Sequence, residues 1–101
     1  MTSSFNMKIE DIEKLEGNTK LTVSSQYGKL CLEIPDSWHS NLEQHISFDM
    51  GDNISHKHIM SGVVYNVDDT NNYISCGGLV QKIPINMQKL MIGQRVVLGI
   101  D

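Results

Sequence analysis

The sequence predicts a small all-β protein, an antiparallel β-barrel of about eight short strands. Apolar and polar residues alternate with a period of two through most of the chain, as strands with one buried face require. Clusters of Gly, Asn and Asp interrupt this alternation at intervals of roughly 8–12 residues, which is typical of sandwiches and barrels. Closing such a sheet removes the exposed strand edges that a small β domain must protect.

A single domain fits the 101-residue length, because no internal repeat, proline-rich linker or block of charge divides the chain. We expect this domain over residues 7–101 and a disordered, polar N-terminus over residues 1–6. No apolar stretch approaches the ~20 residues of a membrane span, so no membrane association is expected. No signal-like segment is found near the start, so Cys31 and Cys76 are expected to be free thiols in a reducing compartment.

The first elements are a single segment and a hairpin. Residues 7–15 alternate like a strand but are ambiguous with a short helix. The hairpin follows, with strands at 21–24 and 30–34 joined by a Gly-containing turn at 26–29. Pro35 ends its second strand because proline has no amide to donate to the ladder.

The middle of the chain holds a lid and the longest strand. Trp38, in the loop after the hairpin, is expected to fold back over the core, and residues 44–49 form another strand. Residues 57–67 are the longest strand candidate, and Gly62 within it indicates a bulge or a bend at a barrel corner. One face of this strand carries Ile59, Ser61, Val63, Tyr65 and Val67.

Three short strands complete the pattern, at 73–76, 79–83 and 95–101. The dipeptide Gly77-Gly78 separates the first two. Between the last two, one helical turn is expected, with three apolar side chains facing inward: Met87, Leu90 and Met91. Together these elements favour a closed or nearly closed barrel, oligonucleotide-binding-like in architecture.

The charge pattern favours a protein partner over nucleic acid. The net charge is −4, from 12 acidic and 8 basic residues, and the basic residues are spread singly instead of forming a stripe. A thin single-strand-binding groove remains an alternative, because base stacking on aromatic rings along a basic surface is how such proteins bind. Its members would be Tyr65, Tyr73, Lys57, Lys82 and Arg95, for which ordinary strand packing is the simpler interpretation.

Catalytic and metal signals are weak. His56 and His58 would lie on the same side of an extended segment and, with His45 or Asp49, could hold a metal, but a solvated strand entry is the favoured explanation, because Lys57 between them disfavours a bound cation. The run at 75–78 superficially resembles a nucleophile loop, yet it lacks the G-x-S-x-G pattern. We therefore expect no catalytic residue, no cofactor and no metal, while the metal affinity of the histidine pair stays open.

The C-terminal half resembles the eighth-subunit family of multisubunit RNA polymerases, the small subunit shared by nuclear polymerases I, II and III, with archaeal and viral counterparts. The resemblance rests on a Gly-x-Val-Tyr element at 62–65, a Tyr-x-Ser-x-Gly-Gly-Leu element at 73–79 and a final Arg-Val strand at 95–96. The N-terminal half matches more loosely. Nuclear members are longer and carry an acidic loop where this chain has only residues 51–58.

This resemblance implies a non-catalytic structural subunit, a pseudo-symmetric barrel of two oligonucleotide-binding-like halves that docks on the largest polymerase subunit, away from nucleic acid. It implies a nuclear location in a eukaryote, and the cytoplasm or a virion for an archaeal or viral protein. The residues expected to line the contact are Tyr73, Ser75, Gly77, Gly78 and Leu79, by addition of a partner strand to their edge. For the glycines the alternative is that they only shape a hairpin. For the function the alternative is a free-standing single-stranded nucleic-acid-binding protein.

Overall fold

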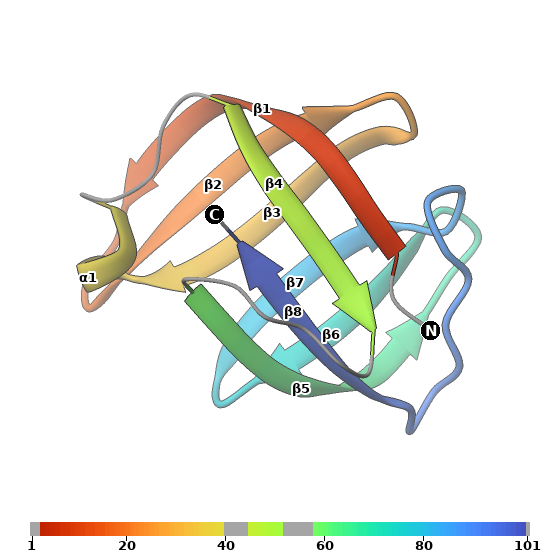
Figure 1. Cartoon of the computed structure of the whole chain (residues 1–101). Helices are drawn as coiled ribbons and strands as arrows, with labels where there is room; N and C mark the ends of the chain where they lie inside the picture. The colour runs from red at the N-terminus through yellow and green to blue at the C-terminus, as the bar shows by residue number, and fades with distance from the viewer. Residues whose placement is uncertain (1–2, 40–44, 52–57, 101) are drawn as a thin grey trace.

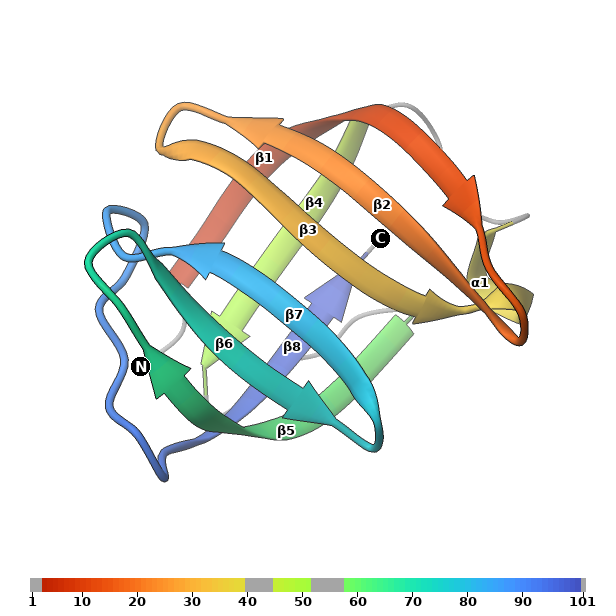
Figure 2. The same ribbon diagram turned by 180° about the vertical axis from the view of Figure 1, so that it is seen from behind.

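The computed structural model describes residues 3–39, 45–51 and 58–100 of the chain. They form an all-β, closed barrel of eight antiparallel strands in the order β1-β2-β3-β7-β6-β5-β8-β4, which confirms the predicted fold class (Figures 1 and 2). The elements are β1 (Ser3–Lys14), β2 (Asn18–Ser25), β3 (Gly28–Pro35), α1 (Asp36–His39), β4 (His45–Gly51), β5 (His58–Val67), β6 (Asn71–Cys76), β7 (Leu79–Pro84) and β8 (Arg95–Ile100).

The barrel consists of two equivalent halves. In each half three strands follow one another as hairpins, and the fourth returns to pair with the first, which is the Greek-key order. The halves join through equivalent strands, β3 with β7 and β4 with β8. Equivalent residues face each other at both joins, Leu32 opposite Gln81 and Asp49 opposite Gly99. The chain therefore has internal pseudo-two-fold symmetry.

A short sequence pattern is shared by the two halves. Both β3 and β7 carry Leu, then Ile four positions later, then Pro, at 30–35 and 79–84. Each proline pairs with an asparagine at the start of the preceding strand, Asn18 with Pro35 and Asn71 with Pro84. A search for repeats in the sequence misses this pattern because only a few residues in each half are shared.

The first strand of each half is bent and shared between two neighbours. β1 pairs with β4 up to Lys8 and with β2 from Lys8 onward, and a bulge leaves Glu10 without an opposite residue. β5 repeats this arrangement, with Val63 as the shared residue and Tyr65 in the bulge. Bulges of this kind bend a strand, as closure of a small barrel requires.

Gly62 allows the bend in β5. A Cβ atom on Gly62 would collide with the carbonyl oxygen of Ser75 and would lie 2.6 Å from Sγ of Cys76. Only glycine fits where the strand turns from β8 to β6, which confirms the predicted barrel corner.

Alternating side chains fill the interior. The alternation places Leu21, Val23, Ile74, Val96 and their counterparts in the core, and the first segment is a strand, not a helix. The other fully buried apolar side chains are Leu30, Leu32, Ile34, Phe48, Met50, Val64, Ile83, Leu98 and Ile100.

Buried polar side chains tie the longer connections to the barrel. Thr19 donates a hydrogen bond to Asp36 of α1 at 2.8 Å. Its equivalent Asn72 donates to the Gln88 carbonyl at 2.8 Å and accepts from the Leu90 amide at 3.0 Å. Both Thr19 and Asn72 are fully buried. In each half, the same position of the second strand therefore holds the connection that leads to the fourth strand.

The short β3–β7 ladder is extended by side chains. The Gln81 amide group exchanges two hydrogen bonds with the main chain of Glu33, at 2.7 and 2.9 Å. The Glu33 carboxylate in turn accepts from the Val80 amide at 2.8 Å. These bonds satisfy buried polar groups and hold the two halves together at the symmetry axis.

Three local expectations can now be compared with the structure. Trp38 packs against the core from α1 and stacks on His58 with ring centroids 4.8 Å apart, as the lid prediction requires. Met87 and Leu90 face inward, but the prediction for Met91 is wrong, because its side chain is 74% exposed. A turn closed by the Gln94 amide on the Met91 carbonyl lifts it off the core.

The N-terminus also differs from the expectation. Residues 3–6 belong to β1 and pair with β4, where the sequence indicated a disordered end over residues 1–6. Residues 1–2 lie outside the described part. No helix among the described residues has the length and apolar character to cross a membrane.

Candidate interaction surface

The outward face of the second half is apolar and aromatic. It is formed by alternate residues of β5 and β6, which we call the β5–β6 face: Ile59, Ser61, Val63, Tyr65, Tyr73 and Ser75. Ile59 is 45%, Val63 37% and Tyr65 50% exposed. Large apolar side chains that gather on one exposed face are typical of a surface that contacts another molecule.

The first half supplies an internal comparison for this face. In the strand register, Lys8 of β1 corresponds to Val63 of β5, because each is the residue at which a bent strand pairs with both of its neighbours. Both bulges lie two residues further on, at Glu10 and Tyr65. The barrel therefore folds with charged side chains at these outward positions, so its own stability does not require apolar residues there.

The β6 position also differs. In the register of the bent strands, Tyr73, which is opposite Asn66, corresponds to Thr22 of β2, which is opposite Asp11. Together these replacements give the β5–β6 face two rings and a valine where the first half carries two charged side chains and a threonine.

The two tyrosines form an ordered pair. Their ring centroids lie 6.2 Å apart at an interplanar angle of 49°. The Tyr73 hydroxyl donates a hydrogen bond of 2.8 Å to Asp68. The pair is therefore fixed in place before any partner arrives, which lowers the entropy cost of binding.

Asp68 anchors the turn between β5 and β6. Its carboxylate accepts hydrogen bonds from the amides of Thr70 and Asn71, at 2.9 and 2.7 Å. These two bonds, and the bond from the Tyr73 hydroxyl, lower the pKa of Asp68 to about 2. The same bond to Asp68 raises the pKa of Tyr73 above its usual value.

Basic residues lie beside the β5–β6 face. Lys82 of β7 is opposite Tyr73, and Arg95 of β8 is opposite Val63. The structure thus brings together four of the five residues predicted for a single-strand-binding groove, while Lys57 lies outside the described residues. The surroundings suit a partner with acidic groups around an apolar centre.

The predicted interface residues separate into two groups. Tyr73 and Ser75 lie on the β5–β6 face, whereas Gly77 and Gly78 form the two-residue turn between β6 and β7. The turn glycines have φ of 59° and 94°, which matches a type I′ hairpin turn and disfavours other residues. Leu79, the first residue of β7, is half-buried. Shaping this hairpin is a definite role of the glycines, and their contact with a partner stays a prediction.

The prediction that a partner docks by adding a strand beside Tyr73 and Ser75 is wrong. Tyr73 pairs with Asn66 on one side and Lys82 on the other, and Ser75 pairs with Val63 and Val80. The closed barrel leaves no edge free at these two residues, so a partner can reach them only through their side chains.

The candidate metal ligands do not form a site in the described residues. His58 is buried and stacked on Trp38, His45 is exposed at the start of β4, and His56 lies outside the described residues. Residues 3–39, 45–51 and 58–100 contain no group of three or more His, Cys, Asp or Glu side chains that could hold a metal ion.

Cys76 is not poised as a nucleophile. Desolvation by burial raises the pKa of its thiol to about 11. The thiol is therefore protonated at neutral pH, and the resemblance of 75–78 to a nucleophile loop has no chemical counterpart.

Sequence reasoning missed one part of the surface. Met91 and Ile92 are strongly exposed, and the Gly93 amide next to them donates to the Val64 carbonyl at 2.7 Å. This bond joins the loop that carries these two exposed apolar side chains to the β5 backbone next to Tyr65. The only signal for this loop in the sequence was the glycine at position 93. In the structure Gly93 has a φ of 90°, as in a tight turn.

Comparison with known proteins adds little to this geometry. No protein-family model matches the chain, and no curated relative matches it. Among solved structures, the molybdate-bound crystal structure of the cytoplasmic molybdate-binding protein ModG matches with a TM-score of 0.40 and 14% sequence identity. The match covers 95% of this chain and 87% of that one.

Proposed function

We propose that this chain is a non-catalytic assembly subunit of a multisubunit DNA-directed RNA polymerase, and that it docks on the largest subunit through the β5–β6 face. One observation carries the docking surface: equivalent positions are charged in the first half and apolar or aromatic in the second, at Glu10 and Tyr65 above all. The polymerase as partner comes from the sequence resemblance at 62–65, 73–79 and 95–96.

The pseudo-two-fold barrel supports this proposal, because two similar halves are what the resemblance implies. So does the composition of the face. Tyrosines at the centre of a contact contribute strongly to binding, since they bury large area and lose little side-chain freedom. Tyr73 is already held by Asp68, and Tyr65 packs beside it.

The proposal assigns the remaining properties as follows. The chain contacts the largest and other polymerase subunits, and it needs no direct nucleic-acid contact, small-molecule ligand or membrane. It resides in the nucleus of a eukaryote, or in the cytoplasm or virion for an archaeal or viral source.

A free-standing single-strand-binding protein is the second candidate. The observation in its favour is the convergence of Tyr65 and Tyr73 with Lys82 and Arg95 on neighbouring strands. Bases would stack on the rings while the cations neutralise phosphates. The net charge of −4 and the small number of cations weigh against it.

Affinity purification from the source cells tests the first candidate. The variant Val63→Lys with Tyr65→Glu gives the second half the residues of the first, and it should fold because the same barrel corner already tolerates them. The matched control is Lys8→Ala with Glu10→Ala on the other half. We expect the β5–β6 variant to recover at least tenfold less of the largest polymerase subunit, and the control to recover as much as wild type. Equal recovery by both would refute the docking surface.

A further inference from the structure

One stretch of strand edge is left open by the bent β1. Its first residues, Ser3–Met7, pair with β4 on one side, while pairing with β2 begins only at Lys8. Within the described residues, no strand pairs with the other edge of this stretch. Five extended residues span about 17 Å, long enough to receive a short peptide strand.

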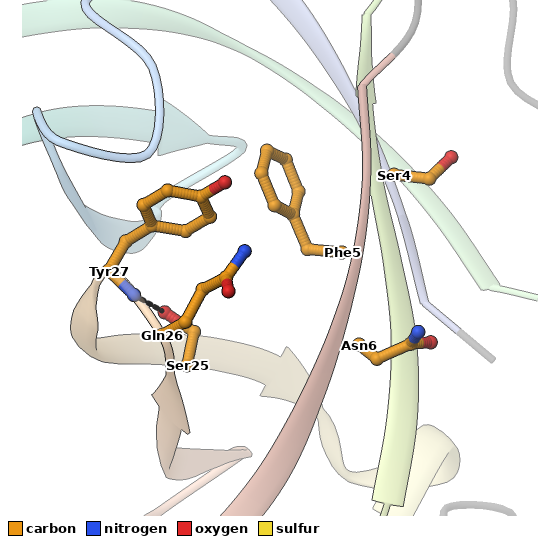
Figure 3. Close-up of a pocket in the computed structure, with 6 residues that line it drawn as sticks. All are labelled: Ser4, Phe5, Asn6, Ser25, Gln26 and Tyr27. Carbon is orange, nitrogen blue, oxygen red and sulfur yellow. Dashed lines mark hydrogen bonds between the residues drawn. The ribbon is translucent and has the colours of Figure 1, made fainter.

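A pocket of about 300 Å³ lies against this edge. Its lining comes from β1 and the tip of the β2–β3 hairpin: Ser4, Phe5, Asn6, Ser25, Gln26 and Tyr27. Figure 3 shows Phe5, Gln26 and Tyr27 pointing toward one another, while the side chains of Ser4 and Asn6 point to the opposite side of β1. The main chain of Ser4 and Asn6 therefore forms that wall of the pocket.

The hairpin tip is built to hold Tyr27 at the mouth of this pocket. The Ser25 hydroxyl accepts from the Tyr27 amide at 3.1 Å and donates to the Gly28 carbonyl at 2.9 Å. The Tyr27 ring meets Phe5 edge to face, with centroids 5.7 Å apart. A rigid tip with an aromatic ring next to exposed backbone suits one apolar side chain of an extended ligand.

The equivalent corner of the second half differs. There Gly62 replaces Met7, and the strands press together so closely that a Cβ on Gly62 would strike the Ser75 carbonyl. The tip of that hairpin is the bare pair Gly77-Gly78. In the described part of the chain, His58–Gly62 of β5 likewise pair with β8 alone, so the unpaired edge occurs in both halves, whereas the aromatic hairpin tip beside it belongs to the first half.

We propose that the β1 edge at Ser4–Asn6 binds an extended, uncharged peptide segment of a partner protein by strand addition, with one apolar side chain of that segment packed against the contacting rings of Phe5 and Tyr27. Extended backbone offers alternating donors and acceptors that match a free edge. None of the six lining residues is charged, so charged side chains gain no partner there. The volume is at the lower end for ligand pockets, which suits one or two side chains better than a cofactor.

A peptide selection tests this inference without any polymerase, so its failure is independent of the proposed function. The probe is a phage-displayed library of random hexapeptides panned on the full chain, followed by synthesis of the best sequence. We expect it to shift the amide resonances of residues 4–6 and 25–27. N-methylation of alternate peptide nitrogens should weaken binding at least tenfold, because strand addition uses every second amide.

Two variants complete the test. Tyr27→Ala should weaken binding at least tenfold, while Tyr65→Ala, which removes an exposed ring from the other half, should leave it unchanged. The inference is overturned if no selected peptide shifts residues 4–6, or if N-methylation at every position is tolerated. It is equally overturned if these amides shift with protein concentration alone, since the occupant would then be a second copy of the chain.

Discussion

Gly62→Ala should destabilise the barrel strongly, because the added methyl group has no room. The new Cβ would strike the Ser75 carbonyl, and it would lie 2.6 Å from Sγ of Cys76 and 2.9 Å from Cγ2 of Ile74. A flexible side chain could move aside. The carbonyl cannot, because Ser75 is paired with strands on both sides.

The magnitude follows from the nature of the collision. Overpacking a close-packed interior costs about 1–3 kcal/mol, and contact with fixed backbone places this variant at the upper end, near 3 kcal/mol. In a domain of this size each kcal/mol corresponds to about 4–8 °C in Tm, so the midpoint should fall by roughly 12–24 °C. This is a large part of the ~5–15 kcal/mol that stabilises a typical domain.

Urea unfolding followed by the fluorescence of Trp38, the only tryptophan, measures the effect. Circular dichroism at the same urea concentrations checks that unfolding is cooperative. Ser61→Ala, at the exposed neighbouring position of β5, is the matched control and should stay within about 0.5 kcal/mol of wild type. If Gly62→Ala were as stable as this control, the claim that a Cβ atom has no room at position 62 would be refuted.

Three further predictions concern the turn between β5 and β6, the buried side chain of Asn72 and the two thiols. The pKa of Asp68 is lowered to about 2 from 3.8, so the ionised carboxylate stabilises the fold fully above pH 4, and this stabilisation is lost as the pH falls toward 2. The urea midpoint of wild type should therefore fall over this pH range by more than the urea midpoint of Asp68→Asn. Asn72→Ala should cost about 2–3 kcal/mol in thermal or urea unfolding, because the Leu90 amide loses its buried acceptor. The Cys76 thiol has its pKa raised to about 11 by burial, so Ellman's reagent at pH 8 should label half-buried Cys31 first; faster labelling of Cys76 would contradict the packing.

The strands could be predicted from the sequence because period-two alternation is a local signal. Leu21 and Val23, or Val96 and Leu98, reveal both the extended conformation and the buried face. The order of strands is not local. That β3 pairs with β7 depends on Leu32 and Gln81, nearly fifty residues apart, and nothing in either strand alone identifies its partner.

Met91 shows where a local pattern misleads. Its spacing from Met87 and Leu90 fits one helical face, but the segment forms turns in which the Asn72 side chain and the Val64 backbone hold the main chain. Those contacts come from distant strands, and they leave Met91 exposed.

The β5–β6 face was partly visible in advance, since Ile59, Val63 and Tyr65 were assigned to one side of a strand. The proximity of Tyr73 was not, because it depends on the register of β5 against β6 and on the bulge at Tyr65. The contrast with the first half also needed the structure, since only the strand register shows that Glu10 and Tyr65 are equivalent.

The proposed subunit role requires that this barrel functions while it is held by a larger polypeptide. Native mass spectrometry of the tagged full-length chain, purified gently from its source cells, tests this most directly. We predict one copy of the chain in an assembly that contains the two largest RNA polymerase subunits. Recovery of the chain alone, or bound only to single-stranded nucleic acid that dissociates as salt is raised, would contradict the claim.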